Sequence, residues 1–509
     1  MLAPFVIFAF LLQASGEIAD TSIVATVGRF TITKRDLMES YEFGPAFVKT
    51  NPKPLRKHLE YMIYERLIAL DVERQHLDTA AFVRDRVAAL EEDLAVDQLY
   101  KDQILSEVRL TPAEIELGVN KARINVRLQW IYAENKSEAE QISRGLKHGI
   151  SFDTLYSRQS KSLENHSERA LETTLLRLTR DNPDFARKVA HLRSQEISEP
   201  IAGPDGYYIV HVDQIWQNPL LTQTENDKLR DVTVKILQAS KADSLAQAYV
   251  RTKMMAANPL IKAEGYDIVR AYFAEKGLSQ ETRLQWNIDT TFMTEAGPQP
   301  IKASGKFLDR PLVTFNEHVL TVRDYLQWFD IRQFELKTRS LAAFNSSVER
   351  TIWKMIQDRL LSEEAYARRL NLRDTVQHEK SKWEAKLLYL AGKSHFLRSI
   401  TIPDSSVRSR YEMEKHRYKD SSGKLLSFAE VKERLRKELD SEQQTKVLFR
   451  VIQRFKKESP VHVNEALVQQ LSSLIEREKT PINVIFYKSG GTFPRVAFPT
   501  IDAEWEAFE

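Results

Sequence analysis

The 509-residue chain contains no cysteine. This absence excludes disulfide bonds, thiol catalysis, thiolate zinc sites and a lipid anchor on an N-terminal cysteine. A chain without thiols is safe in an oxidising compartment, although cytosolic chains can lack cysteine too. Glycine (16 residues) and proline (18 residues) are also scarce, which favours long helices over a sheet sandwich rich in turns.

No charge of one sign dominates the sequence. The 74 Lys and Arg residues nearly balance the 71 Asp and Glu residues, so composition gives no support to nucleic-acid binding. Hydrophobic residues make up 42% and charged residues 28%, which is ordinary globular composition. At ~150 residues per domain, the length predicts about three or four domains. There is no HxxxH pair and no glycine-rich phosphate loop, so we expect no metal, nucleotide or other cofactor.

Long hydrophobic runs are missing as well, because no stretch reaches the ~18 apolar residues that cross a bilayer. The N-terminal run from Met1 to Leu12 is apolar, and the small residues Ala14-Ser15-Gly16 follow at the spacing of a cleavage site. We therefore predict an exported chain with a signal peptide over residues 1–16. No Lys or Arg precedes the run, and the alternative is a buried N-terminal strand.

Two segments of the chain resemble each other. Val24–Leu37 and Val313–Leu326 each predict a short strand, a polar turn, a second strand, and a helix that Thr33 or Thr321 can cap. The parallel continues with Met62–Ile68 and Met355–Leu361 in a following helix, and with Pro112 and Pro403 at the first turn of a later one. The shared order indicates an internal duplication rather than two unrelated helical hairpins.

Between these matched positions, each copy carries a longer helix with an apolar stripe. The stripes consist of Val83, Val87, Leu90 and Leu94 in the first copy, and of Trp383, Leu387 and Leu390 in the second. Long charged helices are predicted at 221–255 and 427–455. The end of the chain, 482–508, predicts a strand pair or a weakly ordered end.

The periodicity changes between Val126 and Trp216. Residues 126–132 alternate as a strand, and a second strand is predicted at 207–212 after a turn rich in glycine and proline. Helices are predicted between them at 137–146, where Gly149 follows as a stop signal, and at 152–160 and 185–192. The result is a small α/β unit of fewer than ~100 residues, well within the size of one domain.

This small unit resembles the parvulin-type peptidyl-prolyl isomerase domain. The motifs that carry the resemblance are Glu138-Ala139, Leu146, Gly149-Ile150-Ser151-Phe152-Asp153, Leu155, Ser160, Phe185, Glu196-Ile197-Ser198-Glu199-Pro200-Ile201 and Gly206-Tyr207-Tyr208-Ile209-Val210. The segment before it, from Val24 to Ile115, resembles the N-terminal chaperone domain of the SurA and PrsA class of foldases. The segment from Phe428 to Asn464 is similar to the C-terminal helix and strand of SurA-like chaperones.

The resemblance implies an α+β, mostly helical fold, in which SurA/PrsA-like helical units carry an inserted parvulin α/β domain. It further implies a SurA-like periplasmic protein, because PrsA proteins are usually anchored through cysteine. The predicted parts are a signal peptide (1–16), an N-terminal SurA-like unit (17–125), a parvulin-like domain (126–216), a helical extension (217–300), a second SurA-like unit (301–480) and a tail (481–509).

Prolyl isomerisation must overcome a barrier of ~20 kcal/mol to rotation about a partial double bond. Similar parvulins supply a His on the first strand, an Asp or Cys after the second helix, a Gly-Gly-Asp-Leu-Gly segment and a His on the last strand. In this sequence those positions fall on Trp130 (or Gln129 in a register shifted by one), Ser162 and Tyr208, and no glycine occurs between Gly149 and Gly203.

Other residues near the expected site do not restore it. Phe185 is similar in place to an apolar pocket residue, although a Phe at helical spacing is more often core. His211 stands three residues after Tyr208, so a regular strand points it to the opposite face. His166 and His191 match no motif. We therefore predict little or no isomerase activity, and the alternative is a remodelled site in which Tyr208 donates to the twisted amide and Trp130 stacks on proline.

The resemblance implies an ATP-independent periplasmic chaperone whose partners are unfolded secreted or outer-membrane polypeptides. The sequence offers no nucleotide motif, which agrees with this expectation. Two other functions remain open: an active isomerase that assists folding in the periplasm, and a non-catalytic scaffold for one folded partner. The sequence does not indicate the clients or the oligomeric state.

Overall fold

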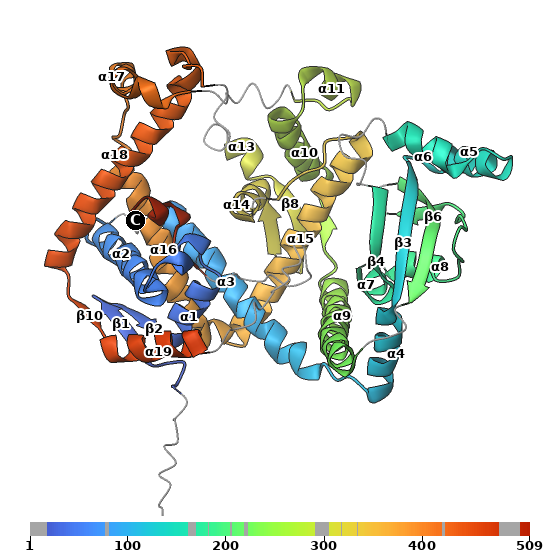
Figure 1. Ribbon diagram of the computed structural model, residues 1–509. Coiled ribbons are helices and arrows are strands. Elements are labelled where there is room, and N and C mark those ends of the chain that lie inside the picture. Colours follow the sequence, from blue (N-terminus) through green and yellow to red (C-terminus); the bar gives the residue numbers. More distant parts are fainter. Residues whose placement is uncertain are drawn as a thin grey trace, which may run out of the picture. The chain divides into compact units, whose positions relative to one another are not determined.

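The computed structural model describes residues 18–76, 81–160, 169–181, 183–203, 206–217, 222–290, 305–316, 318–332, 334–419, 423–477 and 499–508. The predicted signal peptide (1–16), Ser162 and His166 lie outside these ranges, and so does most of the predicted tail. Within them the chain forms an α+β fold dominated by helices, with three small sheets (Figure 1), so the predicted fold class is confirmed.

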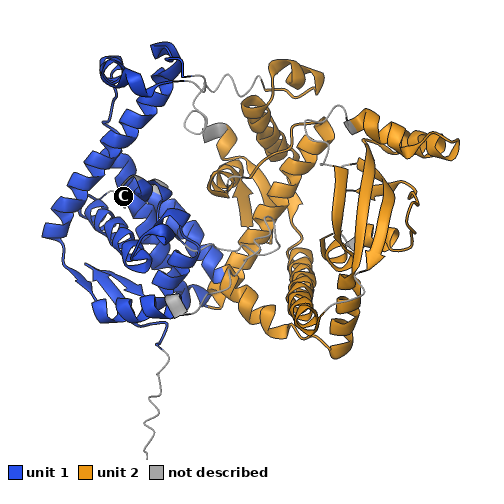
Figure 2. Ribbon diagram, in the orientation of Figure 1, with its two compact units in different colours: residues 1–95, 369–488, 495–509 blue, residues 96–368, 489–494 orange. Residues whose placement is uncertain are grey.

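The chain folds into two compact units (Figure 2). The first contains the described residues of 1–95, 369–488 and 495–509, and the second contains those of 96–368. The boundary in the N-terminal half falls within helix α3 (Ala81–Gln103). The finer sequential division into 17–125, 126–216, 217–300 and 301–480 stays a prediction.

The first unit combines elements from both ends of the chain. Its strands are β1 (Ile23–Val27), β2 (Phe30–Thr33) and β10 (Val461–Val463), in the order β10-β1-β2. Its helices are α1 (Lys34–Glu42), η1 (Ala46–Thr50), α2 (Pro54–Arg74), η5 (Leu370–Leu372), α16 (Asp374–Leu397), α17 (Asp404–Glu414), η6 (Lys415–Arg417), α18 (Phe428–Glu458), α19 (Glu465–Arg477) and η7 (Ala503–Phe508).

Local sequence explains how the first unit begins. Gly28, at φ +55°, makes the tight turn between β1 and β2, because a left-handed backbone is cheap only for glycine. Thr33 then caps α1 as predicted: its hydroxyl accepts from the Asp36 amide, and the Asp36 carboxylate accepts from the Thr33 amide at 2.9 Å. The apolar faces of the sheet, α2, α16, α18 and α19 enclose one hydrophobic core.

The second unit contains two sheets. The elements of its first part are η3 (Leu105–Glu107), α4 (Pro112–Arg123), β3 (Ile124–Ala133), α5 (Lys136–Lys147), α6 (Phe152–Ser160), β4 (Ala170–Thr174), α7 (Leu175–Asp181), α8 (Pro183–Val189), β5 (Ile201–Gly203), β6 (Gly206–Gln217) and α9 (Gln223–Ala257). Its second part has β7 (Leu260–Ile261), α10 (Ala263–Gly277), α11 (Gln280–Gln285), α13 (Gly305–Leu308), β8 (Pro311–Phe315), β9 (His318–Thr321), α14 (Val322–Arg332) and α15 (Leu341–Ala367).

The sheets of the second unit differ in size. The larger sheet is antiparallel, in the order β4-β3-β6-β5, and belongs to the small α/β domain between α4 and α9. The smaller sheet has the order β7-β8-β9. After β9, the Thr321 hydroxyl accepts from the Asp324 amide at 3.3 Å, which confirms the second predicted cap.

Three expectations about local structure need correction. Strand β4 was missed because its sequence lacks clear alternation, and α7 was missed because its 7 residues are too few to show a helical period. Pro403 is the residue before α17 rather than a residue in its first turn. The apolar stripe of α16 does not mark its most buried face: Leu390 of the stripe is 39% exposed, whereas Leu388 and Tyr389 outside it are buried. The buried face of α16 is set by α2, which approaches so closely that a side chain at Gly392 would collide with Val72.

The end of the chain is also better ordered than expected. Residues 503–508 form η7, and Trp505 within it is only 1% exposed. The prediction of a strand pair or a weakly ordered end is therefore wrong for the described residues 499–508. Trp505 joins the core of the first unit, where its ring stacks on Tyr61 at 5.5 Å.

A buried histidine in the first unit predicts a pH effect on stability. His58 is fully buried, with Nε2 2.8 Å from the Ser40 hydroxyl. Burial, assisted by the charges of Lys49 and Lys386, lowers the pKa of His58 to about 3. The unfolded chain, with a pKa near 6.5, therefore binds the proton first as pH falls, and stability is lost below pH 6.5.

We expect His58→Gln to remove this contribution. Relative to the variant, the native protein should lose about 2 kcal/mol of unfolding free energy between pH 7.5 and pH 5. Urea unfolding at a series of pH values measures the difference. His378→Gln is the matched control, because the Asp36 carboxylate raises the pKa of His378, and stability from that pair is lost as pH rises. Parallel curves for the native protein and His58→Gln would contradict the prediction.

Candidate functional site

The predicted site positions lie in the small α/β domain, on the sheet formed by β4, β3, β6 and β5. Trp130 comes from β3, Tyr208 from β6 and Phe185 from α8. All three are half-buried and pack against one hydrophobic cluster. The cluster consists of Val126, Leu128, Leu178, Ala186, Val189, Ile201, Val210 and Val212.

Strand register brings Trp130 and Tyr208 to the same face of the sheet. Trp130 lies opposite Val210, and Tyr132 lies opposite Tyr208. Because side chains two residues apart share a face, Trp130 and Tyr132 on β3 face the same way as Tyr208 and Val210 on β6. The structure thus brings together three of the four predicted positions, Trp130, Phe185 and Tyr208, while Ser162 lies outside the described residues.

Tyr132 is a member of this face that sequence reasoning missed. Its ring meets Tyr208 edge to face, with 5.6 Å between centroids. Two glycines make room for the pair: a Cβ at Gly206 would lie 2.5 Å from the Tyr132 ring, and one at Gly203 would lie 2.5 Å from the Tyr208 ring. The period-two pattern of β3 was the available signal, since Tyr132 follows Trp130 by two residues.

Helix α6 supports the same strand. Among the described residues, β4 pairs with residues 125–129 of β3, and no strand pairs with the rest of β3 on that side. Gln159 makes the hydrogen bonds that a neighbouring strand would make. Its side-chain amide donates to the Tyr132 carbonyl at 2.8 Å, and its side-chain oxygen accepts from the Tyr132 amide at 3.2 Å. This fixes the backbone that carries the aromatic face.

His211 lies on the other face of the sheet, as the strand parity predicted. It is opposite Gln129 on β3, and its ring is 5.0 Å from Phe152 of α6. Its Nδ1 is buried without a hydrogen-bond partner. His191 is exposed. Neither histidine is placed to replace the first-strand or last-strand histidine of a parvulin site.

The chemistry available on the aromatic face is limited. Stabilising a twisted amide requires placed donors and acceptors in a small dry site. At the positions predicted for the two histidines stand an indole and a phenol, whose large apolar surfaces pack on the hydrophobic cluster. The Tyr208 hydroxyl can donate one hydrogen bond, and Trp130 can stack on a ring. Among the described residues, no three His, Asp or Glu side chains gather as metal ligands.

The sequence of this domain matches a known family. Residues 120–220 match the family model of the PPIC-type PPIase domain. This segment is therefore a parvulin-type domain, as the sequence resemblance implied, and it contains Trp130, Phe185 and Tyr208.

The whole chain was also compared with known proteins. Solved structures similar to it include the peptidylprolyl isomerase PrsA of Bacillus cereus (14% identity, covering 45% of this chain and 93% of that one, TM-score 0.21). Others are the foldase PrsA of Streptococcus pneumoniae (14%, 43% and 88%, TM-score 0.22) and a protein described among SurA-like chaperones of Campylobacter jejuni (15%, 46% and 98%, TM-score 0.20). Such low scores do not define the arrangement of the whole chain. No curated protein matches the sequence.

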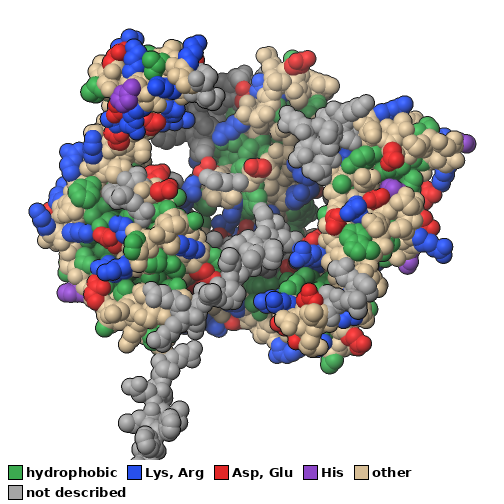
Figure 3. Space-filling model, in the orientation of Figure 1, with side chains coloured by type: hydrophobic (Ala, Val, Ile, Leu, Met, Phe, Trp, Pro, Cys, Tyr) green, Lys and Arg blue, Asp and Glu red, His purple; other side chains and the backbone are tan. Residues whose placement is uncertain are grey.

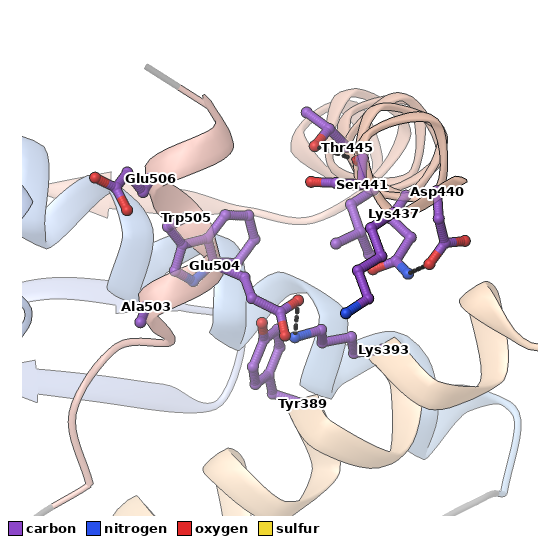
Figure 4. A pocket seen from close by; sticks show the side chains of 12 residues that line it. Tyr389, Lys393, Lys437, Asp440, Ser441, Thr445, Ala503, Glu504, Trp505 and Glu506 are labelled. Carbon is purple, nitrogen blue, oxygen red and sulfur yellow. Dashed lines mark hydrogen bonds and ion pairs between the residues drawn. The ribbon is translucent and has the colours of Figure 1, made fainter. Parts of the chain in front are cut away.

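The first unit contains a separate cavity of about 590 Å³, lined by α16, α18 and η7 (Figure 4). Lys393 of α16 forms ion pairs with Asp502 at 2.7 Å and with Glu504 at 2.6 Å. Burial alone would raise the pKa of Asp502, but the hydrogen bond from Lys393 outweighs it, and the pKa is lowered. The C-terminal segment thereby forms one wall of the cavity.

The surface and the helices add two observations. On the face shown in Figure 3, basic and acidic side chains are interspersed over both units rather than gathered by sign. Among the described helices, none has both the length and the apolar character that crossing a bilayer requires.

Proposed function

We propose that this chain is an ATP-independent chaperone of the periplasm that binds unfolded secreted or outer-membrane proteins, and that its parvulin-type domain has little isomerase activity. The observation that carries the proposal is the aromatic face of that domain: Trp130, Phe185 and Tyr208 pack on one hydrophobic cluster of a domain that matches the parvulin family. The sequence resemblance aligns Trp130 and Tyr208 with the histidines of similar parvulins. A domain kept without its polar site is best explained by binding rather than catalysis.

Two features of the helical parts support polypeptide binding. Large apolar side chains are exposed on several helices, among them Met255 (75%), Leu284 (74%) and Met413 (70%). Burying such side chains against a client contributes a favourable free energy of ~25 cal/mol per Å² of apolar surface removed from water. This is enough for weak, reversible contacts without ATP. The first unit also holds a short segment of its own chain, 499–508, through the buried Trp505.

An aggregation assay tests the chaperone function. At a stoichiometric ratio, the protein should slow the aggregation of an unfolded β-barrel protein. A triple variant, Met255→Ser, Leu284→Ser and Met413→Ser, should suppress aggregation less well. The matched control replaces exposed polar residues of the same helices, Arg251, Gln285 and Glu412, by Ser. No suppression by the native protein would overturn the proposal, and equal suppression by the two triple variants would remove these side chains from the binding surface.

The family match favours one alternative, an active isomerase. A proline-containing tetrapeptide assay distinguishes it. We expect the native protein to accelerate isomerisation little, and Tyr208→Ala to change the rate no more than His211→Ala, which alters the opposite face of the same strand. A clear acceleration that Tyr208→Ala abolishes and His211→Ala preserves would establish the remodelled site instead. Crosslinking in cells addresses the scaffold alternative, because a chaperone captures many clients and a scaffold captures one.

A further inference from the structure

The duplication extends to the end of each repeat. The first repeat, 18–277, closes with the long helix α9, the short strand β7 and the helix α10. The second repeat, 305–477, closes with the long helix α18, the short strand β10 and the helix α19. We call these two helix-strand-helix stretches the closing segments. The helices α9 and α18 even begin alike, with capping boxes formed by Thr222 and Glu225 and by Ser427 and Glu430.

Each closing segment pairs with the hairpin of the other repeat. In the first unit, strand β10, which belongs to the second repeat, pairs with strand β1 of the first repeat. Thr26 lies opposite His462 in this pairing. In the second unit, β7 of the first repeat pairs with β8 of the second, and Thr314 lies opposite Leu260. Both pairings are antiparallel and complete a three-stranded sheet of the same order.

The flanking hydrogen bonds show that the two sheets are equivalent. After β10 the Asn464 amide donates to the Val24 carbonyl at 2.8 Å, and after β7 the Lys262 amide donates to the Leu312 carbonyl at 2.8 Å. Each donor follows its strand by one residue, and each acceptor lies in the first strand of the opposite hairpin. A chance packing of unrelated strands would not reproduce the same bond in both sheets.

We propose that this single chain is built as a strand-exchanged pair, in which each repeat supplies the third strand of the other repeat's sheet. Without its partner, either repeat presents an unpaired edge at β1 or β8, which is a template for another strand. The binding partner of each repeat is therefore the other repeat of the same chain. As a result of the exchange, each unit contains described residues of both repeats.

Comparison of the two repeats also shows where the parvulin-type domain is inserted. In the first repeat this domain lies between α4 and α9. In the second repeat, the described residues at the corresponding place between α17 and α18 form η6 and a short bridge between Lys419 and Leu425. Within the described residues, the parvulin-type domain thus belongs to the first repeat, and the second repeat folds without such a domain.

Cysteine crosslinking tests the exchange, since the chain contains no native cysteine. Four positions suffice: Thr26 and Thr314 are half-buried, and Leu260 and His462 are exposed. The exchanged pairs are Thr26→Cys with His462→Cys, and Leu260→Cys with Thr314→Cys. The matched controls recombine the same substitutions as unexchanged pairs, Thr26→Cys with Leu260→Cys and Thr314→Cys with His462→Cys.

A protease site placed between Asp289 and Gly305 allows the chain to be cut after mild oxidation. We expect the exchanged pairs to keep the two fragments joined at full-length mass without reductant, and the control pairs to release them with free thiols. Disulfides in the control pairs, or free thiols in all four variants when circular dichroism shows folded protein, would overturn the proposal. A product of twice the chain mass would place the exchange between two molecules and would also refute the single-chain form.

Discussion

Replacing Trp505 by alanine is expected to lower the unfolding free energy of the first unit by about 3–5 kcal/mol, the usual cost of removing a buried tryptophan. The ring is stacked on Tyr61 at 5.5 Å and 13° and on Tyr389 at 6.0 Å, and the indole Nε1 donates to Glu65 at 3.1 Å. The cavity left behind would be bounded by helices α2 and α16, whose own packing prevents them from closing it.

Urea unfolding followed by far-UV circular dichroism measures this loss, and limited proteolysis reports whether residues 499–508 detach. Glu506→Ala is the matched control, because Glu506 is exposed one residue away from Trp505 and should change stability by no more than about 0.5 kcal/mol. Equal stability of the two variants would show that the C-terminal segment adds little to the unit.

The second large effect concerns the ion pair beneath that segment. Lys386 of α16 donates to Glu65 of α2 at 2.7 Å, and the Asp502 amide donates to the same carboxylate oxygen at 2.8 Å. Both partners are largely buried. Lys386→Met would leave the carboxylate without its countercharge, and such a loss costs about 3–5 kcal/mol.

The double variant Lys386→Met with Glu65→Gln removes both charges and should recover part of that stability. The same unfolding measurement gives the coupling between the two residues. Arg56→Met is the matched control: its ion pair with Glu465 at 2.9 Å is partly exposed and should cost about 1 kcal/mol or less. A Lys386→Met loss no larger than that of Arg56→Met would contradict the prediction.

Much of the aromatic face could be read from the sequence. The resemblance assigned Trp130 and Tyr208 to the histidine positions, and this assignment stays a prediction. The alternation in β3 and β6 predicted that His211 points away from Tyr208, and the register confirms this. Tyr132 and Gln159 were missed for different reasons. Tyr132 could have been predicted from the same alternation. The Gln159 contact, in contrast, depends on where α6 lies along the edge of β3.

The sequence by itself determined the caps, the first turn and the long helices of this protein. Caps such as Thr33 and Thr321, the turn at Gly28 and the periodicity of the helices depend on residues a few positions apart, so their physical signals are local. These signals also revealed the duplication and the parvulin-type unit.

Only the tertiary structure decided which strand completes which sheet and which residues of the C-terminal segment are buried. Strand edges offer the same backbone donors and acceptors, so the sequence of β10 does not indicate whether it pairs with β1 or β8. The choice depends on the packing of helices far apart in the chain. For the same reason Trp505 could not be assigned to the core until α2 and α16 were placed around it.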